Sequence, residues 1–171
     1  MQHIRIGLRL AALCLVFFSG ASAQQKLHPA DNCQDHADSD IVTFADSVLE
    51  EAVREALSLG PQDALSCSQA AQLRTLRTGG GGARRSVSGS PEWVDPEHVF
   101  HDLSGIQNLA GLTNLALPNR GLSDISPLAE LTKLTHLNLH TNWISDIGPL
   151  RGLTTLVDLR IAENPLTDIS G

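Results

Sequence analysis

The stretch LTKLTHLNLHTNWISDIGPL, residues 131–150, decides the fold of this chain. Around Leu137, leucines alternate with polar residues, as in a strand with one buried face, and the alternation stops at Asn142. Nearly the same order of residues returns at 153–171, in LTTLVDLRIAENPLTDISG, again with an asparagine after the strand. When the pattern of so short a strand recurs further along the chain, it indicates a structural repeat.

The interval is 22 residues, and it holds for several positions at once. The apolar columns are Leu115, Leu137 and Leu159; Leu117, Leu139 and Ile161; Leu122, Ile144 and Leu166; Leu109, Leu131 and Leu153; and Leu103, Ile125, Ile147 and Ile169. An acidic column precedes the isoleucines: Asp102, Asp124, Asp146 and Asp168. Each coil would supply one rung of a parallel sheet and bury its leucines against its neighbours. We expect Asn142 and Asn164 to form a hydrogen-bonded ladder between coils, and Pro127 and Pro149 to begin the return segments.

The motif of residues 131–150, LxxLxxLxLxxNxIxDIxPL, resembles the leucine-rich repeats of internalin-type bacterial surface proteins. The resemblance covers about residues 41–171. It implies an α/β fold, a right-handed leucine-rich-repeat solenoid with parallel β rungs on the concave face, short helical or 3-10 segments on the convex face, and an α-helical N-terminal cap. The predicted organisation is a signal peptide (1–23), an acidic N-terminal arm (24–40), a helical cap (41–75) and leucine-rich repeats (76–171).

Three features depart from the repeat pattern. Arg120 stands at the ladder position with Asn119 one residue early, which predicts an irregular turn. Leu76 and Leu115, aligned as successive strand leucines, are 39 residues apart, 17 more than one period. The glycine- and serine-rich part of this interval predicts an inserted flexible loop at about 79–100. No terminal helix covers the last coil, which predicts a fragment, a truncated product, or self-association through that uncapped coil.

The first 23 residues have the pattern of a secretion signal. Arg5 and Arg9 precede the apolar run AALCLVFF, and ASA at 21–23 supplies small residues for cleavage before Gln24. A retained membrane anchor would need a longer apolar stretch. We therefore expect an exported protein, secreted, at the cell surface or periplasmic, without membrane insertion after the signal is removed.

Two cysteines, Cys33 and Cys67, remain after the signal is removed, and an even pair in an exported chain predicts one disulfide. Two free or separately buried thiols are the alternative, because bridging depends on the separation of the Cα atoms. A metal site is not expected, since neither a CxxC nor an HxxxH motif lies near the two cysteines.

Removal of Arg5 and Arg9 takes the formal net charge from −7 to −9. Much of the acidity lies in DNCQDHADSDIVTFADSVLEEAVREAL, residues 31–57, and argues against nucleic-acid and anionic-lipid partners. Its first part could be read as a calcium loop, but it lacks the glycine turn and the closing glutamate of an EF-hand. A solvated acidic arm is therefore favoured.

Two helices are predicted before the repeats. The first has apolar residues on one face, Leu49, Ala52, Val53, Ala56 and Leu57. Ser47 and Glu50 offer it a capping box, and Gly60 with Pro61 would end it. The second helix would start at another capping box, formed by Ser66 and Gln69.

Side chains that alternate with the buried strand leucines are expected on the concave face. The candidate partner-binding residues are Asn114, His136, Asn138, His140, Asp158 and Arg160, with Trp143 just after the ladder asparagine. Trp143 is either an exposed binding anchor or packs over a neighbouring coil. His136 beside Asp158 favours cross-strand hydrogen bonding over catalysis, because neither a nucleophile nor a third orienting group converges on the pair.

The sequence contains no GxSxG, HExxH or P-loop motif, so neither enzyme activity nor a cofactor is expected. The resemblance to internalins implies a secreted or surface-exposed recognition or adhesion module. Such a module would use its concave face to bind another protein or a surface glycan. The alternative is an N-terminal targeting or regulatory fragment of a larger multidomain surface protein or enzyme.

Overall fold

The computed structural model describes residues 24–78 and 99–167. The predicted signal peptide (1–23), nearly all of the predicted inserted loop (79–98), and the final residues 168–171 lie outside the described residues. Within the described ranges no helix is both long enough and apolar enough to cross a bilayer. The division into arm, cap and repeats and the handedness of the coil stay predictions.

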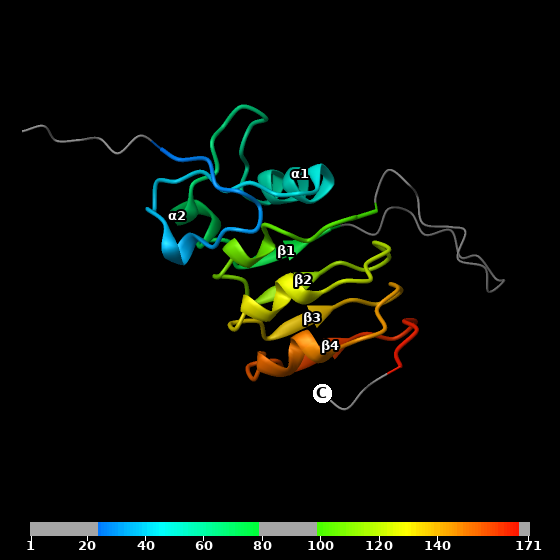
Figure 1. The fold of residues 1–171 in the computed structure, drawn as a ribbon. Coiled ribbons are helices and arrows are strands. Elements are labelled where there is room, and N and C mark those ends of the chain that lie inside the picture. The colour runs from blue at the N-terminus through cyan, green and yellow to red at the C-terminus, as the bar shows by residue number, and fades with distance from the viewer. Residues whose placement is uncertain (1–23, 79–98, 168–171) are drawn as a thin grey trace, which may run out of the picture.

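Four strands of three residues each form one parallel sheet in the order β1-β2-β3-β4 (Figure 1). They are β1 (Thr75–Arg77), β2 (Asn114–Ala116), β3 (His136–Asn138) and β4 (Asp158–Arg160). The register pairs the central leucines Leu76, Leu115, Leu137 and Leu159 in one row across the sheet. The predicted solenoid is thus confirmed, and so is the alignment of Leu76 with Leu115 across 17 extra residues.

Each return path contains one 3-10 helix: η3 (Ile106–Asn108), η4 (Ser126–Glu130) and η5 (Gly148–Gly152). These segments stack on one another as the strands do, η3 on η4 and η4 on η5. Pro127 and Pro149 lie in the first turn of η4 and η5, as predicted, where the fixed φ of proline suits a helix start.

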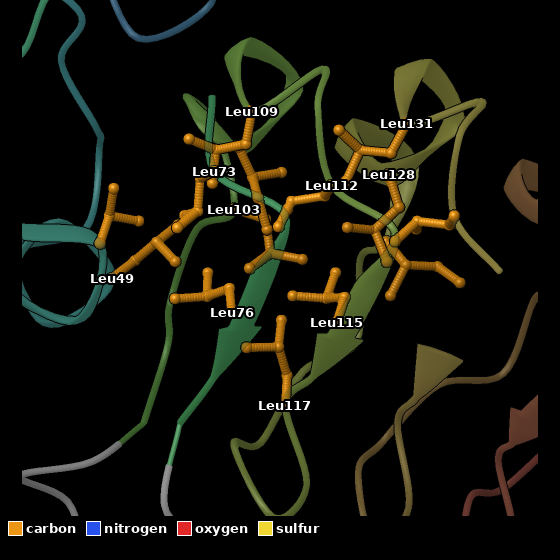
Figure 2. Close-up of a cluster of buried hydrophobic side chains, with 14 of the residues drawn as sticks. Leu49, Leu73, Leu76, Leu103, Leu109, Leu112, Leu115, Leu117, Leu128 and Leu131 are labelled. Carbon is orange, nitrogen blue, oxygen red and sulfur yellow. The ribbon is translucent and has the colours of Figure 1, made fainter. Parts of the chain in front are cut away.

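The core lies between the sheet and the return segments, and Figure 2 shows leucines of neighbouring coils meeting there. Burial is uniform along the row of strand leucines until the last coil. Leu137 of β3 is 1% exposed, whereas Leu159 of β4 is 41% exposed and Val157 beside it is 81% exposed. The apolar layer under β4 is therefore partly exposed, unlike the layers under the other three strands.

Asn142 joins two coils through hydrogen bonds to the backbone. Its Oδ1 accepts from the N–H groups of Arg120 and Leu122 in the preceding coil, at 2.9 and 3.1 Å. Its Nδ2 donates to the carbonyl oxygens of Leu117 and Leu139, both at 2.9 Å. The side chain is 2% exposed, so it satisfies backbone groups that water does not reach.

Asn164 repeats this arrangement one coil later. Its Oδ1 accepts from the N–H of Ile144, and its Nδ2 donates to the carbonyl oxygens of Leu139 and Ile161. The predicted asparagine ladder is confirmed at both positions.

The acidic column begins the return segments. In each coil the aspartate Oδ1 accepts from the N–H two residues ahead, which is an Asx turn: Asp102 from Ser104, Asp124 from Ser126 and Asp146 from Gly148. At Asp124, hydrogen bonds from the side chain and the backbone N–H of Ser126 hold the pKa of the carboxyl below its usual value.

The irregular turn predicted at Arg120 is wrong. Asn119, Thr141 and Glu163 hold equivalent places in three coils, with φ of 54°, 57° and 58°, so the turns share one conformation. Arg120 is 3% exposed and takes the ladder position itself. Burial lowers the pKa of its guanidinium.

Arg120 contacts both ends of the insertion. Its Nε donates to Thr78 Oγ1 at 3.1 Å, and its guanidinium lies 5.3 Å from the centre of the Phe100 ring. The backbone carbonyl of Arg120 also accepts from the N–H of Phe100. Phe100 is 2% exposed and fills the column of Leu122 and Ile144, so this residue, placed at the end of the predicted loop, belongs to the core.

Helix α1 (Ser47–Ala56) packs against β1 and buries Leu49 and Val53. Its N-cap is Asp46 and not Ser47, because the Asp46 carboxylate accepts from the N–H groups two and three residues ahead. The predicted Ser47 capping box is therefore wrong. The helix also ends four residues before Gly60, where Ser58 adopts a φ of 57°.

Helix α2 (Cys67–Ala70) begins at the predicted capping box of Ser66 and Gln69. The first residue of α2, Cys67, forms the predicted disulfide with Cys33, which precludes the alternative of free thiols in this structure. Cys33 itself begins a short 3-10 helix, η1 (Cys33–Asp35).

The acidic arm is tied to the repeats at several points. The Cys33 N–H donates to Asn108 Oδ1 of η3 at 2.6 Å, and Gln107 Nε2 donates to the carbonyl of Pro29. Asp40 is 6% exposed and accepts from the N–H groups of Gln25 and Ala37. The expectation of a solvated arm is therefore wrong for Asp40. Its buried carboxylate joins two backbone segments of the arm through hydrogen bonds.

Replacing the same strand leucine in two coils tests the limit of the core. We expect Leu137→Ala to lower the free energy of unfolding by about 2–5 kcal/mol, as for a buried leucine. Leu159→Ala should cost about 1 kcal/mol, because its side chain remains partly in water. Denaturant unfolding of both variants measures the difference, and equal losses would contradict an open layer under β4.

Removing the disulfide tests how firmly the arm is held. The bond joins residues separated by 34 positions. In the chain-entropy model, its loss lowers the free energy of unfolding by roughly 4 kcal/mol. The double variant Cys33→Ser with Cys67→Ser should show this loss in denaturant unfolding. A loss below about 1 kcal/mol would mean that the hydrogen bonds of Asn108 and Gln107 hold the arm without the covalent link.

Candidate functional site

The outer face of the sheet carries the side chains that flank each strand leucine. Since neighbouring residues of a strand point to opposite faces, these side chains point away from the core. They surround a shallow hollow of about 250 Å³ to which all four strands contribute, here named the strand-face groove. It is lined by Arg77, Asn114, Leu115, Ala116, His136, Leu137, Asn138, Asp158 and Arg160.

Five predicted residues line this groove together: Asn114, His136, Asn138, Asp158 and Arg160. His140 and Trp143 do not line it. They follow β3 on the turn towards the return segment, where His140 Nε2 lies 3.7 Å from a carboxylate oxygen of Glu163 in the next coil. Trp143 is 50% exposed, which favours the exposed alternative over packing against a neighbouring coil, but it is not among the residues that line the groove.

The two asparagines of the groove have their side-chain oxygens occupied. Asn138 Oδ1 accepts from the backbone N–H of His140 at 3.0 Å, which fixes the orientation of this amide. Asn114 Oδ1 accepts from the Thr113 hydroxyl at 3.0 Å. Among the described residues neither amide nitrogen donates a hydrogen bond, so each offers two N–H donors to a ligand.

The charged residues lie at the two ends of the groove. At the β4 end, Arg160 Nε donates to Asp158 Oδ2 at 3.2 Å, with 68% and 40% of the two side chains exposed. Such an exposed pair contributes little to stability and can open for a ligand. At the β1 end, Arg77 is exposed and makes no hydrogen bond or ion pair within the described part of the chain.

The pair of His136 and Asp158 does not form the predicted cross-strand hydrogen bond. The register places the two residues opposite each other, as expected. However, His136 Nδ1 bonds the hydroxyl of Thr135, its chain neighbour, and Asp158 bonds Arg160. Both side chains therefore use partners close to them in the chain, at one and two residues' distance. In residues 24–78 and 99–167, no three metal-ligating side chains gather at one point.

Arg77 is the groove residue that the sequence reasoning missed. It follows Leu76, as Ala116, Asn138 and Arg160 follow the other strand leucines, so it belongs to the same row. The alignment of Leu76 with Leu115 contains this signal, because it places Arg77 at an outward-facing position of the first strand.

Comparison with known proteins agrees with the repeat geometry. A family model for leucine-rich repeats, in two copies, matches residues 110–152. A comparison with curated protein sequences found no match. An internalin of Listeria monocytogenes, InlF, is 31% identical with a TM-score of 0.60, and the match covers 74% of this chain and 33% of that one.

The functional domain of InlJ, also from Listeria monocytogenes, is 24% identical with a TM-score of 0.50, which shows the fold alone. That match covers 74% of this chain and 24% of the InlJ chain. The chain thus spans a third or less of the length of these two internalins.

The segment that the family model matches, 110–152, contains Asn142 of the ladder and the strand leucines Leu115 and Leu137, which lie one 22-residue period apart. The described structure has one rung of parallel sheet per period with a 3-10 return segment behind it, and its TM-score of 0.60 to InlF shows that the two folds are similar. The chain is a leucine-rich-repeat protein of the internalin type.

Proposed function

We propose that this chain is a protein-binding module whose binding surface is the strand-face groove. The observation that carries the proposal is the groove itself, to which each of four coils contributes polar or charged side chains. A rigid scaffold that presents side chains from several separate segments on one open face suits recognition of a partner. The fold alone would not identify this surface.

A protein partner is favoured over a surface glycan. The groove contains amides, a histidine, two arginines and a carboxylate, but no Trp, Tyr or Phe ring on which a sugar could stack. Trp143 supplies an exposed ring, yet it lies outside the groove lining. We assign Trp143 and His140 to the rim of the partner contact, where they would add to binding without defining it.

Export and the lack of enzyme activity belong to the same proposal. The disulfide supports an exported protein, because such bonds persist in oxidising compartments. The acidic composition supports a partner other than nucleic acid. The Thr135 hydroxyl lies next to His136 but donates to the Thr113 carbonyl and does not line the groove, which supports binding rather than catalysis. The alternative, a targeting or regulatory part of a larger surface protein or enzyme, and self-association through the last coil stay predictions.

Filling the groove tests the proposal. Ala116 lies at its centre, so Ala116→Trp would occupy the hollow without altering the core beneath it. The matched control is Ala162→Trp, an exposed alanine outside the groove lining. Peptides selected against the purified protein from a random library displayed on phage should lose about tenfold or more in affinity for the Ala116 variant alone.

Thermal unfolding of both variants establishes that they remain folded. Equal affinity of the selected peptides for the two variants would contradict the assignment of binding to the strand-face groove.

A further inference from the structure

We propose that the strand-face groove recognises an acidic protein segment in an extended conformation, with a carboxylate of that segment bound to Arg77. This inference rests on the proposed function and specifies the chemistry of the partner. It follows from the donors, the charges and the spacing of the groove residues.

The groove offers more donors than acceptors. The Asn138 amide oxygen already accepts from the His140 N–H, whereas both N–H donors of its amide nitrogen are available to a ligand. Arg77 adds a guanidinium with five N–H donors and no acceptor. The main acceptor, the Asp158 carboxylate, already binds Arg160. A partner that satisfies this surface must therefore bring acceptors, which are carboxylates and backbone carbonyls in a protein.

The charge of the groove is opposite to that of the chain. The lining contains two arginines against one aspartate, whereas the chain has a formal net charge of −7. Arg77 lies exposed at the β1 end, without an ion-pair partner in the described residues. An exposed guanidinium suits bidentate binding of a carboxylate, which fixes the orientation of the ligand as well as its charge.

The strand spacing sets the shape of the ligand. Arg77 belongs to β1 and Asn138 to β3 in the same row, so two strand intervals of about 4.8 Å separate the two residues. The resulting distance of about 10 Å equals roughly three residues of an extended chain. An acidic side chain on Arg77 thus places a backbone carbonyl three residues away near the Asn138 amide. Ala116, between them in β2, leaves room for the backbone to pass.

The test uses peptides from a random twelve-residue library on phage, selected against the purified full chain. We expect the selected peptides to be enriched in Asp and Glu and their affinity to fall as salt is raised. Arg77→Gln should weaken them about tenfold, as should Asn138→Asp. The second change keeps an oxygen for the His140 N–H and replaces the amide donor with a repelling carboxylate oxygen. Lys133→Gln removes one exposed positive charge outside the groove lining and should leave affinity unchanged.

The outcomes separate this inference from the proposed function. Peptides without an acidic preference that still lose affinity on Ala116→Trp would overturn the inference and keep the groove as a binding surface. The same holds if Lys133→Gln weakens acidic peptides as much as Arg77→Gln does. Peptides unaffected by any groove variant would overturn both. An array of acidic glycans that binds through Arg77, with no peptide selected, would replace the protein segment by a sugar.

Discussion

The hydrogen bonds of Asn142 hold the arrangement on which the rest of this structure depends. Each strand contributes only three residues, so backbone pairing between coils is brief and needs support where the strand ends. Asn142 binds two N–H groups of the preceding coil and carbonyl groups of both coils, and Asn164 extends the ladder. These bonds fix the place in each coil where the chain turns. The turn position sets the phase of each strand, that is, which of its residues face the core and which face the solvent.

Because the phase of each strand is fixed, the residues on the outer face of the sheet can vary in type. Two positions of each strand carry no packing requirement, because the leucine between them supplies the buried contact. The strand-face groove is lined by seven of these eight positions, all except Thr75, together with Leu115 and Leu137, and its chemistry can differ between proteins that share the same core. The mixture of two arginines, two amides and one carboxylate in the groove is therefore a property of this chain and not of its repeat.

The repeat could be predicted from the sequence because each buried column is visible at one period, and the strand pairing followed from it. Which of several nearby hydrogen-bond partners a side chain or a helix start uses could not be predicted as well. Asp46 and Ser47 are both good N-caps, and only the folded chain shows that Asp46 also accepts from the N–H of His101. His136 and Asp158 lie opposite each other, yet each binds a residue close to it in the chain, Thr135 and Arg160 respectively. The place of Arg120 depends on Thr78 and Phe100, which come together only in three dimensions.

The contacts of Arg120 have a consequence for changes in chain length. Thr78 and Phe100 bracket the extra residues, and both are held by this one side chain and its backbone. The ends of the segment are thus fixed by the coil beneath them, whatever lies between. The entropy of closing a chain between fixed ends grows only with the logarithm of its length, about 0.6 kcal/mol for each doubling. Residues can therefore be gained or lost between Thr78 and Phe100 at small thermodynamic cost, while the coils below keep their frame. This makes the first coil a natural point for grafting a foreign sequence.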